Sequence, residues 1–140
     1  MINWNDNFSV NNTEIDDQHK ELISIIEEVV LVVHTKDYNF IKITEIVAKL
    51  EEYIKVHLEY EENLMVKYSY PFLEFHVKDH NELRYRTQNI KVFDVNKLDE
   101  FYTDTLIYLV DWLTRHIMQV DKQLGEFLLE IDVKQCKDKE

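Results

Sequence analysis

The chain contains almost none of the residues that shape tight turns, with one glycine and one proline among 140 residues. Hairpins, multi-stranded sheets and glycine-rich phosphate loops depend on such residues, so all-β folds and P-loop nucleotide sites are disfavoured. The composition, 45% apolar and 31% charged, is typical of a globular domain. We therefore expect a few long helices within one domain that spans residues 1–140.

Cysteine, positive charge and long apolar runs are also scarce. Cys136 is the single cysteine, which excludes an intramolecular disulfide and predicts an exposed, unreactive thiol. The formal charge of -12 repels nucleic-acid phosphates and anionic lipid. The longest apolar run, Val29–Val33, is too short to span a membrane, and the first residues lack the pattern of a signal peptide. We expect a cytoplasmic protein without nucleic-acid or membrane partners, and a protein partner stays open.

Four segments place apolar residues at alternating steps of three and four, which is the spacing of helices that pack along one face. Because the connections are short, the sequence predicts an all-α, antiparallel up-down-up-down four-helix bundle. An N-terminal arm precedes it and a short C-terminal helix follows. The expected ranges are 1–11 for the arm and about 12–36, 40–67, 71–90, 97–120 and 122–134 for the helices.

Capping residues mark the expected helix starts. Asn12 or Thr13 would cap the first helix, with Asp16 as a capping-box acid. Pro71 suits the first position of the third helix, and Asn96 would cap the fourth.

Metal-ligating residue types interrupt the apolar seams of all four helices. They stand where leucine or isoleucine is expected: His19, His57, Glu61, His76, His80 and His116. Burying a carboxylate costs on the order of several kcal/mol unless something compensates its charge. A bound metal explains both the buried carboxylate and the surrounding imidazoles.

The antiparallel topology of the predicted bundle argues against a chance arrangement of these six residues. His57 and Glu61 are one helical turn apart, as are His76 and His80, and either pair alone is a weak signal. In the predicted bundle, however, all six positions fall at the same end. His34 lies fifteen residues after His19, roughly 20 Å away along the helix, and is expected at the surface. Spacing alone leaves out Asp121, which lies five residues after His116 and about 140° around a regular helix.

The strings IDDQHKEL, HLEYEENLM, YPFLEFHVKDH and WLTRHIMQVD carry these residues, and together they resemble the hemerythrin family in its bacterial single-domain form. The resemblance covers roughly residues 4–133 and adds Asp121 to the ligand set. It implies a non-haem centre of two iron ions. One iron would be held by His76, His80 and His116, the other by His19 and His57. Glu61, Asp121 and an oxo or hydroxo group would bridge them.

This ligand set fills all but one of the positions that two six-coordinate irons offer, and the vacancy falls on the iron with two histidines. Dioxygen would bind there. The resemblance implies a dry pocket over the vacancy, lined by Leu22, Leu58, Trp112, Leu113 and Ile117. For Asp121 to reach the cluster, the fourth helix must contain a π-bulge or end near residue 119 or 120.

The sequence therefore favours a non-enzymatic protein that binds dioxygen reversibly for storage, delivery or buffering. A di-iron oxidase or peroxidase is the first alternative, although ferritin-like centres use four carboxylates and two histidines. A stand-alone oxygen or redox sensor and a structural site for another ion, such as zinc, are the others.

Overall fold

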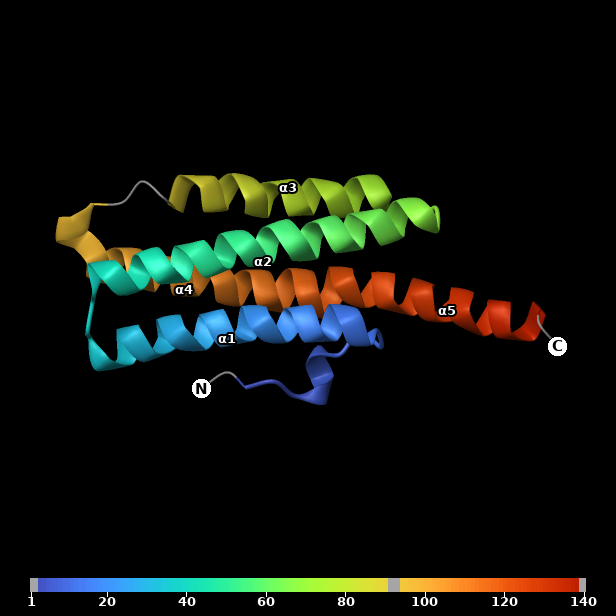
Figure 1. Cartoon of the computed structure of the whole chain (residues 1–140), viewed down its shortest axis with the longest axis horizontal. Helices are drawn as coiled ribbons and strands as arrows, with labels where there is room; N and C mark the ends of the chain where they lie inside the picture. The colour runs from blue at the N-terminus through green and yellow to red at the C-terminus, as the bar shows by residue number, and fades with distance from the viewer. Residues whose placement is uncertain (1–2, 91–93, 139–140) are drawn as a thin grey trace.

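The computed structural model describes residues 3–90 and 94–138, and the regular elements within these ranges are all helical. The four helices of the bundle are α1 (Thr13–Thr35), α2 (Phe40–Lys67), α3 (Leu73–Ile90) and α4 (Leu98–Trp112). Helix α1 packs against α2 and α4, α2 packs against α3, and consecutive helices run in opposite directions (Figure 1). The predicted all-α four-helix bundle is confirmed.

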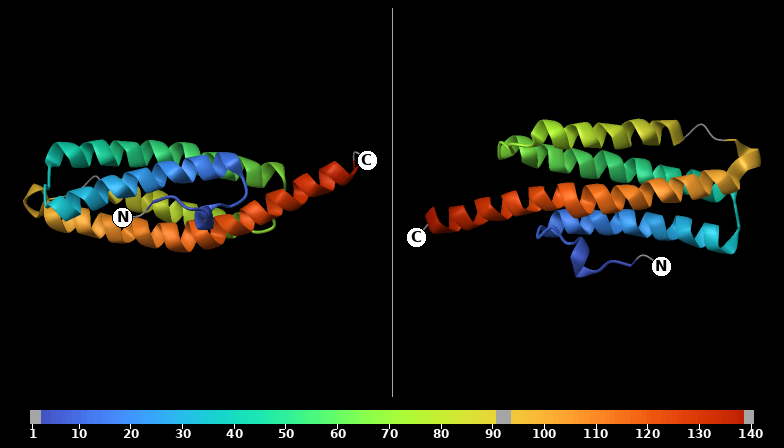
Figure 2. Two further views of the ribbon diagram at one scale, coloured as in Figure 1. Left: turned by 90° about the horizontal axis from the view of Figure 1, so that it is seen from below. Right: turned by 180° about the vertical axis from the view of Figure 1, so that it is seen from behind.

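The fourth helix continues without a break into the C-terminal segment. A π-helix, η3 (Leu113–Asp121), follows α4, and α5 (Lys122–Asp138) follows η3 with right-handed helical angles at both junctions. Helix α5 projects beyond the end of the bundle (Figures 1 and 2). It begins at the expected residue 122 but ends later than the expected residue 134. The π-helix keeps the chain helical at Asp121, so α4, η3 and α5 form one continuous helix.

Helix α1 begins at its predicted cap, but Asp16 has a different role from the predicted one. The side chain of Asn12 accepts a hydrogen bond from the backbone N–H of Ile15 at 3.0 Å, so Asn12 rather than Thr13 is the cap. The carboxylate of Asp16 accepts hydrogen bonds from Val10 N–H at 2.9 Å and from Ser9 Oγ at 2.6 Å. Asp16 thus holds the N-terminal arm instead of closing a capping box, since it stands one residue too far from the true cap.

Two other predicted helix starts are wrong. Pro71 lies in the turn before α3, because a backbone hydrogen bond from Leu73 to Tyr70 closes a turn around it. Asn96 lies inside a short 3-10 helix, η2 (Val95–Lys97), where its N–H is capped by the side chain of Asp94 at 2.9 Å. The rest of the predicted connection, residues 91–93, lies outside the described residues.

The single glycine allows the N-terminal arm to cross the C-terminal helix. A Cβ atom on Gly125 would lie 2.0 Å from the carbonyl oxygen of Val10, so a larger residue would displace the arm. Val10 is buried there, and Trp4 and Phe8 of the arm are partly buried against the bundle.

The apolar core forms two clusters along the bundle. The larger one fills most of the length and includes Leu22, Leu58 and Ile117. The smaller one includes Ile15, Met65, Tyr70, Leu124 and Leu128. Helices α1, α2 and α3 contribute to both clusters, and α4 with η3 contributes to the larger one and α5 to the smaller one. The side chains between the clusters therefore occupy a layer with apolar groups on both sides. Within residues 3–90 and 94–138, no helix has the length and apolar character needed to cross a membrane.

Candidate metal centre

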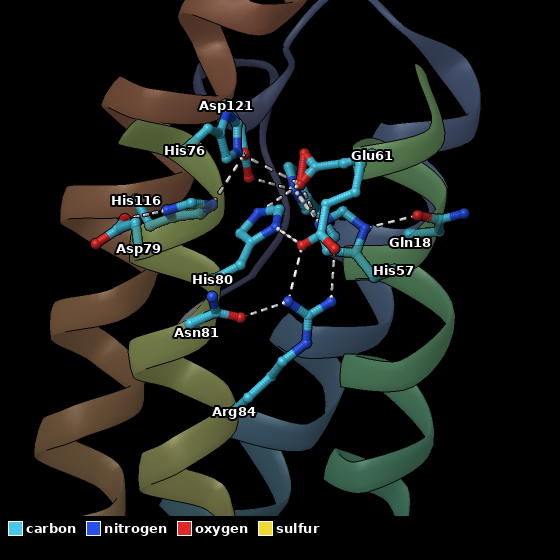
Figure 3. Close-up of polar contacts among 12 residues, drawn as sticks. Gln18, His57, Glu61, His76, Asp79, His80, Asn81, Arg84, His116 and Asp121 are labelled. Atoms are coloured by element: carbon cyan, nitrogen blue, oxygen red, sulfur yellow. Dashed lines mark hydrogen bonds and ion pairs between the residues drawn. The ribbon is translucent and has the colours of Figure 1, made fainter. Parts of the chain in front are cut away.

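The structure brings all seven predicted ligand residues together in the layer between the two apolar clusters (Figure 3). Helix α1 supplies one, α2 two, α3 two and η3 two, and each is at most 2% exposed: His19, His57, Glu61, His76, His80, His116 and Asp121. His34, the remaining histidine, is exposed in the last turn of α1.

The seven residues form two overlapping groups in which every ligand atom lies within 4.8 Å of the others. The three-histidine group contains His76, His80 and His116, and the two-histidine group contains His19 and His57. Glu61 and Asp121 belong to both groups. This division of the residues is the one that the resemblance implies, with Glu61 and Asp121 common to both groups.

In the three-histidine group, the Nε2 atoms point at the shared carboxylates. His76 Nε2 lies 2.9 Å and His116 Nε2 3.0 Å from Oδ1 of Asp121. His80 Nε2 lies 3.4 Å from Oε1 of Glu61. Three imidazoles therefore converge from two helices on one small space.

The two-histidine group repeats this arrangement across the bundle. His19 Nε2 lies 3.0 Å from Oδ2 of Asp121, and His57 Nε2 lies 3.1 Å from Oε1 of Glu61. The two Nε2 atoms are 3.1 Å apart. Each carboxylate thus contacts imidazoles of both groups.

Asp121 joins the cluster because the helix that carries it is a π-helix. His116 and Asp121 lie five residues apart within η3, and their side chains approach to 3.0 Å. A π-helix brings residues i and i+5 onto nearly the same face, whereas a regular helix would direct Asp121 away. Of the two predicted alternatives, a π-bulge or a helix end near residue 119 or 120, the structure has the π-helical one.

Many polar atoms of the cluster are buried without a hydrogen-bond partner among the described residues. They include both carboxylate oxygens of Glu61 and of Asp121, and the Nε2 atoms of His76, His80 and His116. Leaving so many buried donors and acceptors unsatisfied is very costly, and native proteins avoid it. Atoms that crowd together without hydrogen-bond geometry are what a shared cation requires, so the donor set fits bound metal.

The electrostatics of the site favour ionised carboxylates. Burial and the neighbouring Asp121 would raise the pKa of Glu61, but contacts with His57 and His80 outweigh them and lower it to about 2. Burial would likewise raise the pKa of Asp121, yet His116, His19 and His76 hold it well below its ordinary value. Both groups therefore carry the negative charge that a bridging ligand needs.

Two imidazoles of the three-histidine group are hydrogen-bonded to carboxylates that are in turn held by arginines. Sequence reasoning missed these supporting residues. Nδ1 of His80 lies 2.8 Å from Glu62, which also accepts two hydrogen bonds from Arg84 at 2.8 and 2.9 Å. Figure 3 shows Arg84 below the cluster, with its guanidinium directed toward it. By occupying Nδ1, Glu62 leaves Nε2 of His80 free for the centre.

The second such chain starts at His116. Nδ1 of His116 is hydrogen-bonded to Asp79, and Asp79 also accepts a hydrogen bond from Arg115 at 3.0 Å. Burial would raise the pKa of Asp79, but the bonds from His116 and Arg115 lower it to about 2. The sequence signal that could have indicated this role is an acid next to a ligand residue, since Asp79 directly precedes His80 and Glu62 directly follows Glu61.

The two-histidine group has a neutral support instead. Nδ1 of His57 lies 2.6 Å from the amide oxygen of Gln18, and Nδ1 of His19 has no hydrogen-bond partner among the described residues. The negative charge that stands behind the imidazoles is therefore confined to the three-histidine group.

The five predicted pocket residues are all buried in the larger apolar cluster: Leu22, Leu58, Trp112, Leu113 and Ile117. The indole of Trp112 stacks on His116, with ring centroids 4.1 Å apart and planes 15° apart. Apolar side chains therefore cover the cluster on the side of Trp112 and His116.

A four-helix bundle that buries five histidines and two carboxylates in one layer defines a helical cation-binding domain. The profile of the hemerythrin HHE cation binding domain matches residues 10–128, and the chain therefore belongs to the hemerythrin family.

Two relatives support this assignment over nearly their whole length. The chain is 27% identical to bacteriohemerythrin of Clostridium acetobutylicum, over 88% of this chain and 98% of the relative. It is 30% identical to bacteriohemerythrin of Methylococcus capsulatus, over 86% of this chain and 91% of the relative. The family and the buried cluster together establish a metal-binding function of the hemerythrin type, with non-haem iron as the metal.

Proposed function

We propose that the protein binds dioxygen reversibly at a centre of two iron ions, for oxygen storage, delivery or buffering. The observation that carries the proposal is the pair of overlapping ligand groups that share Glu61 and Asp121. Two shared carboxylates are suited to bridging two ions, and the two-histidine group offers one protein ligand fewer. Similarity to two bacteriohemerythrins supports the same assignment.

Bound iron would supply the electrons that reversible dioxygen binding requires. His76, His80 and His116 would hold one ion, His19 and His57 the other. The chain itself provides five imidazoles, two carboxylates placed to bridge, and a layer closed by apolar side chains. Excluding water from this layer slows the proton entry that would turn bound oxygen into a released product.

The histidine-rich set also favours a carrier over an enzyme. Ferritin-like di-iron enzymes use four carboxylates, whereas this cluster has two carboxylates and five histidines. Leu22 and Ile117, which lie in the larger apolar cluster, have side chains that can neither donate nor accept a proton.

Oxygen uptake by the reduced, iron-loaded protein tests the proposal. We expect about two irons per chain and about one dioxygen per two irons, with the starting spectrum restored on deoxygenation over repeated cycles. Catalytic consumption of a supplied reductant would replace the carrier by an oxidase. A retained ion that is zinc alone after iron loading would leave only a structural site.

A further inference from the structure

Tyr53 is a buried tyrosine that lies against the two-histidine group and has no role in the centre as described so far. It stands one turn before His57 in α2, and its ring stacks on that imidazole with centroids 5.0 Å apart and planes 15° apart. The residue is 3% exposed. Its ring therefore belongs to the wall of the metal layer.

The hydroxyl group of Tyr53 is buried and has no hydrogen-bond partner among the described residues. Phenylalanine would fill the same space without the penalty of an unsatisfied donor. Buried tyrosine hydroxyls normally find a partner, so this one indicates a group that the protein chain itself does not supply.

The surroundings define what that group can be. A tyrosine hydroxyl has an ordinary pKa of about 10 and keeps its proton at neutral pH. The Tyr53 hydroxyl therefore offers a donor. A donor in an acidic layer is suited to a small ligand that carries negative charge when bound.

We propose that the Tyr53 hydroxyl donates a hydrogen bond to the small exogenous ligand held on the two-histidine side of the centre. The inference rests on the proposed function, because that side is where the ligand set leaves a position open. Dioxygen and small inorganic anions share the required chemistry, since each presents a partly negative atom to a donor. The Tyr53 hydroxyl then has a hydrogen-bond partner when a ligand is bound and none when the position is empty.

The chain offers a matched control in Tyr102, a buried tyrosine at the opposite end of the bundle. Its hydroxyl donates to the backbone oxygen of Asn39 at 2.7 Å. Tyr53→Phe and Tyr102→Phe thus remove the same atom from two buried tyrosines, one without a protein partner and one with such a partner.

The test titrates azide into the oxidised, iron-loaded wild type and both variants, followed by visible absorbance. We expect Tyr53→Phe to raise the azide dissociation constant about threefold to tenfold, the range for one lost hydrogen bond, and to shorten the lifetime of the oxygen adduct. Tyr102→Phe should leave the azide constant unchanged.

Thermal melting of the metal-free proteins provides a readout that does not depend on the centre. Tyr53→Phe should melt at or above the wild-type temperature, because it removes an unsatisfied group, whereas Tyr102→Phe should melt lower. An azide constant unchanged by Tyr53→Phe would overturn the inference. So would a loss of melting temperature as large as that of Tyr102→Phe, because the hydroxyl would then have a partner within the protein or its water.

The wild-type protein separates this inference from the proposed function. If wild-type protein binds two irons and dioxygen reversibly but Tyr53→Phe behaves like wild type, only the role of Tyr53 fails. If wild-type protein forms no oxygen adduct, the proposed function itself fails.

Discussion

The three-histidine and two-histidine groups share their carboxylates but differ in what stands behind their imidazoles. Glu62 and Asp79 support His80 and His116, and each carboxylate is itself held by an arginine. Behind His57 stands the neutral amide of Gln18. A carboxylate that accepts from Nδ1 fixes the ring and makes Nε2 a stronger donor to metal.

This difference indicates that the two groups have different roles in the centre. The three-histidine group has an oriented, anionic support suited to holding its metal permanently. The two-histidine group has a weaker support, and Tyr53 with its unpaired hydroxyl lies on the same side. Under the proposed function, the three-histidine group would anchor one ion and the two-histidine group would hold the ion that accepts the ligand.

Removing a carboxylate that both groups share has the largest expected effect, because it should weaken metal binding in the three-histidine and the two-histidine group alike. Glu61 contacts imidazoles of both groups, so Glu61→Ala should lower bound iron from about two to below one per chain. Elemental analysis of protein loaded with iron measures this. Glu59→Ala, at an exposed position of the same helix, is the control and should retain the wild-type iron content. Retention of two irons by Glu61→Ala would show that Glu61 is not a bridge.

Removing the metal should destabilise one end of the bundle more than the other. The site end would keep buried polar atoms without hydrogen-bond partners, such as the carboxylate oxygens of Glu61. The far end, in contrast, is closed by the Tyr102–Asn39 hydrogen bond and apolar packing. We expect the melting temperature to fall by on the order of 10 °C. Hydrogen exchange should accelerate around Glu61 before it does around Leu50. Uniform acceleration along α2 would contradict a local role for the metal.

Much of this centre follows from helical period and topology. Spacing places His19, His57 and His76 on the inner faces of their helices, and antiparallel packing brings them to one end. Asp121 could not be placed in this way, because a regular helix directs residue i+5 away. Its place came from the resemblance to hemerythrins, and the π-helix supplies the physical reason.

The supporting residues could not be predicted for a different reason. Asp79, Glu62 and Gln18 lie beside the seams, where a polar residue is ordinarily solvated. Each reaches a histidine on a neighbouring helix, so its role depends on side-chain rotamers and interhelical distance. The turn at Pro71 was also missed, since a proline before a helix fits both the first helical position and the preceding turn.

Neutralising one supporting carboxylate should weaken the three-histidine group selectively. Asp79→Asn keeps the shape of the side chain but removes the charge behind His116, so iron release to a chelator should accelerate by about tenfold to a hundredfold. The accelerated phase should account for one of two irons. Release kinetics followed by the absorbance of the chelate measure both phases.

The opposite change, adding a negative charge behind the two-histidine group, tests the same difference. Gln18→Glu places a carboxylate behind His57 and should slow release of the second iron. If Asp79→Asn and Gln18→Glu change both phases equally, the two groups are not supported independently.

The smallest expected effect is a pH-dependent contribution of Glu62 to the stability of the metal-free protein. Burial would raise the pKa of Glu62, but bonds from His80 and Arg84 lower it to about 2 from its ordinary value of 4.5. The carboxylate therefore contributes stability above pH 4.5, and this is lost as the pH falls toward 2. Burial lowers the pKa of His80, yet Glu61 and Glu62 raise it above 6.5, so its contribution is present below pH 6.5 and is lost as the pH rises through the raised value.

The pair formed by Glu62 and His80 should consequently stabilise the protein most between pH 4.5 and 6.5. Denaturant unfolding of metal-free wild type and Glu62→Gln should differ by about 1 kcal/mol at pH 5.5, and by less at both pH 2.5 and pH 9. Glu59→Gln, which changes the same charge at an exposed position, should show no such maximum. If the difference between wild type and Glu62→Gln stays constant across this range, Glu62 supports His80 through shape alone, and the charge behind the three-histidine group is not what distinguishes it.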